Sequence, residues 1–231
     1  MLRLADRVVV STPALAESLA ARRSDTVVVP NGLDERLWGD TPPAPRQGPN
    51  RSPVRILCMG TATHDADFAM ILPALTRLHT AFGARIAVDM IGFSGANKLP
   101  YWVNRLGMPP HASKSYPGFV NWMKAQPGWD IGLVPLVASG FNRCKSPIKT
   151  LDYAALGLAI LASDVPVYRG SVADGPGGFL VPNDEDAWYN ALSRLVRDTD
   201  LRRRLGQGAS EAFSAGGTLA ARDEAWRAAL S

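Results

Sequence analysis

Two lysines beside a predicted helix start are the residues of this sequence best suited to bind an anion. Ser146 is a favourable N-cap residue, and Pro147 suits the first position of a helix. Lys145 and Lys149 add ammonium groups where free N–H groups and the helix dipole already favour negative charge. The pattern predicts a phosphate-binding site; the alternative is a solvated helix start with ordinary surface lysines. Asp152, one turn further on, could accept hydrogen bonds from a ribose diol or simply pair with Lys149.

A second polar segment, residues 60–67, follows a predicted strand and opens the next helix. Gly60 would let a ligand approach the backbone closely, and Thr61 offers a hydroxyl group. His64 is a candidate acid, base or phosphate contact, or else an ordinary surface residue. Asp65 and Asp67 form an Asp-x-Asp pattern that can bind a divalent metal, but a helix cap is the simpler interpretation for one of them. We therefore expect no metal at this site.

The composition is that of a globular protein, with 46% hydrophobic and 20% charged residues. The net charge of +4 is spread along the chain, so it does not imply nucleic acid, although a loose affinity for anionic membrane surfaces is compatible with it. Cys58 and Cys144 lack zinc-like or Cys-x-x-Cys spacing and favour a reducing compartment. We find no secretory signal and no apolar run long enough to span a membrane, so we expect a cytoplasmic protein that contacts membranes at most peripherally. With three histidines and no Ser-His-Asp or paired-carboxylate motif, hydrolase chemistry has little support.

Short apolar segments alternate with longer amphipathic ones, and this alternation predicts an α/β fold. Nearly continuous apolar strands indicate a doubly wound, mainly parallel, Rossmann-like sheet with helices on both faces. We expect strands at 7–11, 26–30, 54–59, 85–91, 130–135, 159–163 and 179–181, and helices at 13–23, 67–82, 119–125, 185–197, 199–215 and 218–230. The helix after the lysines should end at Gly157, where a left-handed residue fits.

Ligands of such sheets bind at the carboxyl ends of the strands, so the loops that leave those ends should border one crevice. Those loops are residues 60–66, 92–98, 136–146 and 163–178. Residues 39–53, with five prolines and two glycines, form the clearest linker. The linker separates a strand–helix–strand unit at 1–38 from a main domain at 54–217, which residues 218–231 follow as a C-terminal helix.

Four segments, taken in order, resemble the nucleotide-sugar glycosyltransferases of the GT-B fold, group 1 (GT4-like). Residues 5–11 resemble the last strand of that family's acceptor-side domain, and residues 27–34 resemble its interdomain passage, Val-x-Pro-Asn-Gly-x-Asp. Residues 130–136 resemble the strand before the donor loop, and residues 145–163 resemble the donor-site helix and the strand after it. The likeness covers essentially the whole chain, but only the second, C-terminal half of a normal enzyme.

The resemblance implies the donor-binding half of an enzyme that moves a sugar from a nucleoside diphosphate sugar to an acceptor hydroxyl, without metal or cofactor. It implies that Asp152 binds the ribose, whereas Cys144 replaces a glutamate of the family pattern and Thr61 replaces an arginine. We expect Lys145 and Lys149 to supply the missing phosphate charge. The expected donor and diphosphate contacts are Gly60, Thr61, Asn142, Lys145, Ser146 and Lys149, with His64 as the catalytic candidate.

In such an enzyme the acceptor site lies in an N-terminal domain; about residues 1–26 would be its last strand–helix piece, and the rest of 1–38 would be the interdomain passage. That domain would lie upstream or on a partner chain, and the helix at 218–230 would pack against it; we expect no nucleic acid partner. Two alternatives remain: a non-catalytic nucleotide-sugar-binding module that needs a partner chain, and a Rossmann-like scaffold or signalling domain without a nucleotide site. The sequence does not define the base, the sugar, the acceptor or the stereochemical outcome.

Overall fold

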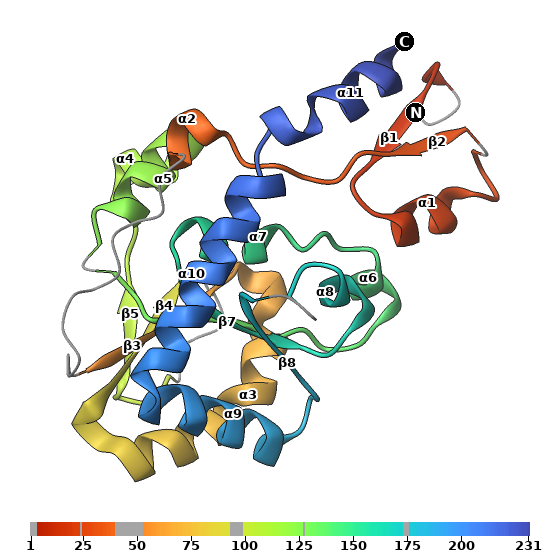
Figure 1. Cartoon of the computed structure of the whole chain (residues 1–231). Coiled ribbons are helices and arrows are strands. Elements are labelled where there is room, and N and C mark those ends of the chain that lie inside the picture. Colours follow the sequence, from red (N-terminus) through yellow and green to blue (C-terminus); the bar gives the residue numbers. More distant parts are fainter. Residues whose placement is uncertain (1–3, 24, 40–52, 93–98, 127, 173–175) are drawn as a thin grey trace.

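The computed structural model describes residues 4–23, 25–39, 53–92, 99–126, 128–172 and 176–231, which form two parallel sheets and their helices (Figure 1). The large sheet has the strand order β5-β4-β3-β6-β7-β8, and every pair in it is parallel. Its strands are β3 (Val54–Met59), β4 (Ile86–Ile91), β5 (Val103–Leu106), β6 (Ile131–Val134), β7 (Ala159–Ser163) and β8 (Gly178–Val181). The small sheet pairs β1 (Val8–Val10) with β2 (Thr26–Val28). The predicted α/β fold with a mainly parallel, doubly wound sheet is confirmed.

Helices cover both faces of the large sheet. On one face lie α3 (Asp65–Phe82) and α9 (Glu185–Arg197); on the other lie α5 (Tyr116–Lys124), α7 (Ile148–Ala155) and the second half of α10 (Thr199–Gly216). The shorter elements are α1 (Pro13–Leu19), α2 (Glu35–Trp38), α4 (Pro110–Ser113), α6 (Gly140–Arg143), α8 (Pro166–Arg169), α11 (Asp223–Leu230) and the 3-10 turns η2 (Ala62–His64), η3 (Gly83–Arg85) and η4 (Ala220–Arg222). None of the helices within the described ranges has the length and apolarity needed to cross a membrane.

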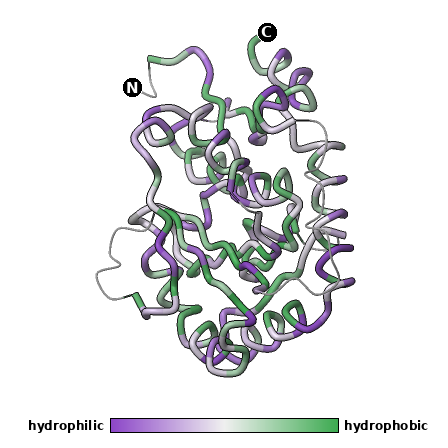
Figure 2. The backbone as a smooth tube through the Cα atoms, turned by 90° about the vertical axis from the view of Figure 1, so that its left-hand side faces the viewer, coloured by the Kyte–Doolittle hydropathy of each residue, from purple (hydrophilic) through white to green (hydrophobic). Residues whose placement is uncertain are grey.

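The central strand β3 shows why the strands read as continuous apolar runs. Its side chains alternate between the two faces, and both faces are covered. Val54, Ile56 and Cys58 pack with α3 and α9, whereas Leu57 and Met59 pack with the cluster on the opposite face. Figure 2 shows hydrophobic strand segments in the interior, between helices of mixed hydropathy. The core is therefore in two layers, and the sheet lies between them.

Several short elements differ from the sequence-based expectation. β5 was not predicted because it is an edge strand in which Asn104 and Arg105 are exposed, so it lacks an apolar run. The four-residue helices α2, α4, α6 and α8 are too short to show a helical period. α3 begins at Asp65, one half-turn before its predicted start. The predicted linker at 39–53 falls almost entirely on residues 40–52, outside the described part of the chain.

The last segment of the chain returns to the first (Figure 1). Leu33, after β2, exchanges backbone hydrogen bonds with residues 217 and 219, and Arg7 Nη1 donates to the carbonyl oxygen of Ala229 at 2.6 Å. The expected helix at 218–230 is interrupted, because a strand-like bridge at Thr218 and the turn η4 precede α11. Trp226 and Leu230 on α11 stay 40% and 77% exposed. The division into domains stays a prediction.

Candidate functional site

The site begins at the carboxyl ends of β3 and β4, where two glycines meet. Gly60 donates its N–H to the carbonyl oxygen of Ile91 at 2.9 Å. Gly92 has φ +82°, and a Cβ at that position would lie 2.2 Å from the carbonyl oxygen of Gly60. Only glycine fits at Gly92. This close contact holds the two strand ends together and leaves Gly60 at the carboxyl end of β3. The rest of the predicted loop at 92–98 lies outside the described residues.

The loop that carries the lysines is braced by its own polar side chains. Ser139 caps α6 by accepting a hydrogen bond from the N–H of Asn142 at 3.0 Å. The Asn142 amide, which we expected at the diphosphate, donates from Nδ2 to the carbonyl oxygen of Val137 at 2.7 Å. Cys144 turns toward the N-terminal segment, where its Sγ donates to the carbonyl oxygen of Ala14 at 3.7 Å. These contacts fix the path of the chain into α7.

The start of α7 corrects one sequence-based prediction. Pro147, not Ser146, occupies the N-cap position, and no side chain caps the helix. The hydroxyl of Ser146 instead accepts a hydrogen bond from Asn31 Nδ2 at 2.8 Å, which ties this loop to the passage after β2. The first N–H groups of α7 are therefore left without a side-chain acceptor, and such groups attract anions. At the other end Gly157 has φ +69°, as predicted for a residue that ends a helix.

Lys145 is the residue that most directly indicates an anion-binding position. Its Nζ atom is buried and has no hydrogen-bond partner among the described residues; the Phe141 ring centroid lies 5.2 Å away. A buried ammonium group without a partner is costly, so native proteins pair such groups. An anion bound in front of α7 would supply the partner. Phe141 is 71% exposed and lies at the outer side of this position.

Lys149 and Asp152 have shifted protonation equilibria that also favour a polar ligand. Burial lowers the pKa of Lys149 to about 8, and the nearby charge of Lys145 acts in the same direction. Burial raises the pKa of Asp152 to about 7, against the attraction of Lys149; Asp152 is 8% exposed. Both shifts mean that burial removes solvation from the charged form of each side chain. Hydrogen bonds from a diphosphate to Lys149 and from hydroxyl groups to Asp152 would restore it.

The 60–67 segment places an ion pair beside the lysines. His64 Nδ1 lies 2.6 Å from Asp67 Oδ2, and the N–H of Val137 donates to Asp67 Oδ1 at 2.7 Å. The expectation that Asp65 or Asp67 caps α3 is wrong, because His64 holds the N-cap position and no side chain caps the helix. Thr61 shares a hydrogen bond with Thr63, with 3.0 Å between the two hydroxyl oxygens, at the surface. Within the described ranges no group of His, Cys, Asp and Glu side chains could hold a metal ion.

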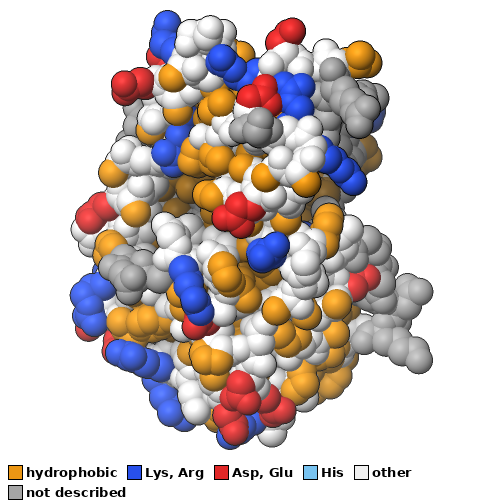
Figure 3. All heavy atoms as spheres, turned by 90° about the vertical axis from the view of Figure 1, so that its right-hand side faces the viewer, with side chains coloured by type: hydrophobic (Ala, Val, Ile, Leu, Met, Phe, Trp, Pro, Cys, Tyr) orange, Lys and Arg blue, Asp and Glu red, His pale blue; other side chains and the backbone are white. Residues whose placement is uncertain are grey.

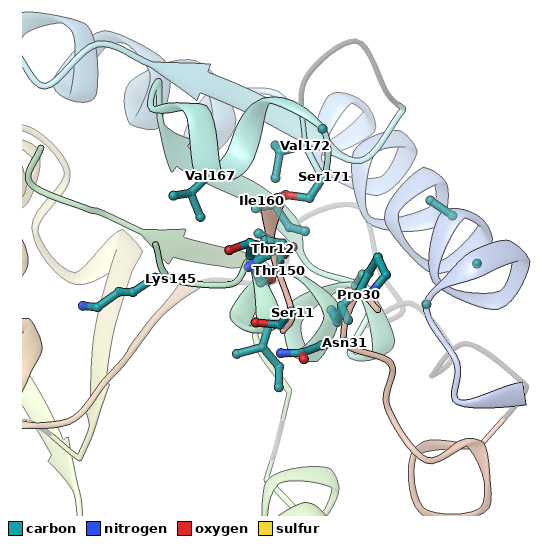
Figure 4. Close-up of a pocket in the computed structure, with 18 of the residues that line it drawn as sticks. Ser11, Thr12, Pro30, Asn31, Lys145, Thr150, Ile160, Val167, Ser171 and Val172 are labelled. Carbon is teal, nitrogen blue, oxygen red and sulfur yellow. Dashed lines mark hydrogen bonds between the residues drawn. The ribbon is translucent and has the colours of Figure 1, made fainter. Parts of the chain in front are cut away.

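A cavity of about 840 Å³ lies against α7 and was not predicted (Figure 4). The close-up shows Lys145 extending away from the cluster of residues around Thr12. The walls of the cavity come from the N-terminal segment, α7, β7, the loop after α8 and α10. Lining residues include Ser11, Thr12, Asn31, Thr150, Ile160 and Val172. On the face shown in Figure 3, Lys and Arg side chains are interspersed with acidic and hydrophobic ones.

Known proteins match this chain in sequence over most of its length. Residues 53–198 match the model of a family described as glycosyl transferases group 1. A curated relative, phosphatidyl-myo-inositol mannosyltransferase from Mycolicibacterium smegmatis, is 28% identical over 222 residues, which are 90% of this chain and 53% of that protein. The chain thus spans about half the length of this relative.

Two solved structures share the fold at low sequence identity. Anabaena Alr3699/HepE, solved in complex with UDP and glucose, has a TM-score of 0.73 and 14% identity; the match covers 99% of this chain and 63% of that one. Sucrose-phosphate synthase from Thermosynechococcus elongatus has a TM-score of 0.67 and 18% identity, covering 98% of this chain and 59% of that one. At these identities the likeness shows the fold: the sheet and helices described above are those of the C-terminal part of a GT-B protein.

Proposed function

This chain belongs to the group 1 glycosyltransferase family, and from that premise we propose that it binds a nucleoside diphosphate sugar as the donor half of a transferase. The reaction would move the sugar from the diphosphate to an acceptor hydroxyl. The acceptor site would lie in a domain that precedes this chain or on a partner chain, because the relatives are considerably longer. We propose no nucleic acid partner for the chain.

The observation that supports the proposal is the buried ammonium group of Lys145, for which the described part of the chain offers no hydrogen-bond partner. It lies beside Lys149, whose ammonium group is poorly solvated because it is buried. It also precedes the N-terminus of α7, which has no side-chain cap. Two ammonium groups and free backbone N–H groups match the negative charge and the many acceptor oxygens of a diphosphate. Asp152, within reach of Lys149, would accept hydrogen bonds from the ribose hydroxyls.

The same groups suit the chemistry of sugar transfer. When the bond between the sugar and the diphosphate breaks, negative charge develops on the leaving phosphate oxygen. Positive groups fixed at that point stabilise the charge without any reorganisation of solvent. Lys145, Lys149 and the α7 N–H groups would therefore do the work that a metal ion does in other transferases, and we propose a metal-independent reaction.

The chain lacks the arginine and the lysine that the family pattern has after the first donor-domain strand, and it lacks the first glutamate of the donor loop. Thr61 stands where the pattern has arginine, and its hydroxyl is shared with Thr63 at the surface. Cys144 stands where the pattern has glutamate, and its sulfur faces Ala14 and not the site. Neither residue supplies a positive charge to the donor. We therefore assign the charge that balances the diphosphate to Lys145 and Lys149, and we call the segment 145–149 the lysine loop. We also propose a cytoplasmic protein with at most peripheral membrane contact, since its cysteines favour a reducing compartment.

Thermal unfolding with added nucleotides tests the proposal. UDP, GDP and ADP are compared with their nucleosides in buffer containing EDTA. We expect at least one diphosphate to raise the unfolding temperature, its nucleoside to have little effect, and EDTA to make no difference. Lys145→Ala should abolish the rise, whereas Arg204→Ala, which removes an exposed cation on α10, should preserve it. Stabilisation that requires a metal, or that survives Lys145→Ala, would contradict the proposal.

A further inference from the structure

Asp67 joins the two loops that border the lysines, and it is almost completely buried. It lies in the first turn of α3 and is 1% exposed. One carboxylate oxygen lies 2.6 Å from His64 Nδ1, and the other accepts the N–H of Val137, just beyond β6, at 2.7 Å. The carboxylate is thus held on both sides, and its position relative to the imidazole ring is fixed.

This arrangement determines which nitrogen of His64 carries the proton. Burial opposes the ionised form of Asp67, but hydrogen bonds from His64 and from Val137 outweigh it and lower the pKa of Asp67. An ionised carboxylate has no proton to donate, so the hydrogen bond between the two side chains must come from Nδ1–H of the ring. Nε2, on the other side of the ring, makes no hydrogen bond to any of the residues that the structure describes.

His64 lies in the 60–67 segment, where Thr61 brings no positive charge to the site. The ring follows Gly60 by one turn, and its side chain is 12% exposed, so it is held between protein groups. Val137 donates its N–H to Asp67 and accepts Asn142 Nδ2 at its carbonyl oxygen, so these hydrogen bonds join the histidine–aspartate pair to the loop that carries Lys145.

We propose that Asp67 is a positioning residue that fixes His64 in the Nδ1–H form and presents Nε2 to a phosphate oxygen of the bound donor. This inference rests on the proposed function, because it names a further group at the same diphosphate. A neutral ring in this form presents a lone pair at Nε2. The ring can donate to a phosphate oxygen only when Nε2 carries a proton as well as Nδ1, and in that form the Asp67 carboxylate still accepts the Nδ1–H.

Asp67 also braces two loops, and a purely structural role would give different results. Nitrogen-15 NMR of the three histidines identifies which ring nitrogen is protonated, and His64→Gln assigns the signal. At a pH where the ring is neutral, we expect His64 to show the Nδ1–H form. In Asp67→Asn the amide NH2 would face the ring while its oxygen keeps the Val137 N–H, so the ring should change to the Nε2–H form. An Nε2–H ring in the unsubstituted chain overturns the proposal.

Binding of inorganic pyrophosphate, measured by calorimetry near neutral pH, tests whether His64 contacts the bound phosphate. His64→Gln should weaken binding by roughly tenfold, the value typical of a hydrogen bond to a charged group. Asp67→Asn should weaken binding when His64 is present but not in the His64→Gln background, because its effect passes through the ring. Equal weakening in both backgrounds would mean that Asp67 acts only by bracing the loops, and the proposal would be wrong.

The two proposals fail in distinguishable ways. If the unsubstituted chain binds no pyrophosphate and no nucleotide, the proposed function fails, while the NMR result still reports on the pair. If Lys145→Ala abolishes pyrophosphate binding but His64→Gln leaves it unchanged, the proposed function stands and the role of His64 is refuted.

Discussion

Asp152 gives a prediction about stability that can be worked from its surroundings. Burial raises its pKa from 3.8 to about 7, so the folded chain holds a proton that the unfolded chain releases. Stability from this group is therefore complete below about pH 4 and is lost as the pH rises toward 7. The difference is about 3 pKa units, and at about 1.4 kcal/mol per unit it amounts to a ceiling of about 4 kcal/mol.

Replacing Asp152 by Asn removes the charge and keeps the shape. We expect Asp152→Asn to increase the free energy of unfolding by about 1–4 kcal/mol near pH 8, and to have little effect near pH 4, where the wild-type carboxyl is already protonated. Urea denaturation followed by tryptophan fluorescence at several pH values measures this difference. Asp200→Asn, at a side chain that is 72% exposed, is the matched control and should show no such pH-dependent gain.

Two results would refute the reasoning. A gain that is the same at every pH would mean that the side chain's shape, not its ionisation, matters. A loss of stability near pH 8 would mean that the Asp152 carboxylate is well solvated or well paired in the folded chain. A gain of stability in Asp152→Asn would fit a binding role, because residues of functional sites often lower the stability of the folded chain.

The remaining predictions concern the ligand and the backbone. Asp152→Asn should weaken UDP binding but leave pyrophosphate binding unchanged, since only UDP has a ribose; equal loss for both would exclude a ribose contact. Because the pKa of Lys149 is about 8, affinity for a diphosphate should fall as the pH rises through that value, and Lys149→Arg should remove this fall in calorimetric titrations. Gly92→Ala should lower the free energy of unfolding by about 3 kcal/mol, because its Cβ would meet the Gly60 carbonyl and its φ is positive. Gly39→Ala, with a similar φ of +83° but no atom within 4 Å of the added Cβ, should cost less, about 1–2 kcal/mol from backbone strain alone, in the same urea titration.

The fold could be predicted from the sequence wherever burial leaves a long or regular pattern. β3 and β7 are buried on both faces and read as apolar runs, and α3 repeats its apolar residues at helical spacing. β5 could not be predicted, because two of its four residues face solvent at the edge of the sheet. Four-residue helices such as α6 have no period to detect.

The site divides in a similar way. The lysine loop was located because the charges and the helix start are close in sequence. The N-cap assignment of Ser146 failed because its hydroxyl bonds to Asn31, which is 115 residues away and invisible to a local pattern. The His64–Asp67 pair was available from its spacing of three residues at a helix start, but the N–H of Val137 that completes it comes from the loop after β6, about 70 residues away in sequence.

The central claim is that the lysine loop binds the diphosphate of a sugar donor. Isothermal titration of UDP, GDP and ADP into the unsubstituted chain, into Lys145→Ala and into Arg204→Ala tests it most directly. We expect at least one diphosphate to bind in EDTA, Lys145→Ala to weaken that binding by at least about tenfold, and Arg204→Ala to leave it unchanged. Absence of binding by all three nucleotides, or an affinity that does not depend on Lys145, would contradict the account.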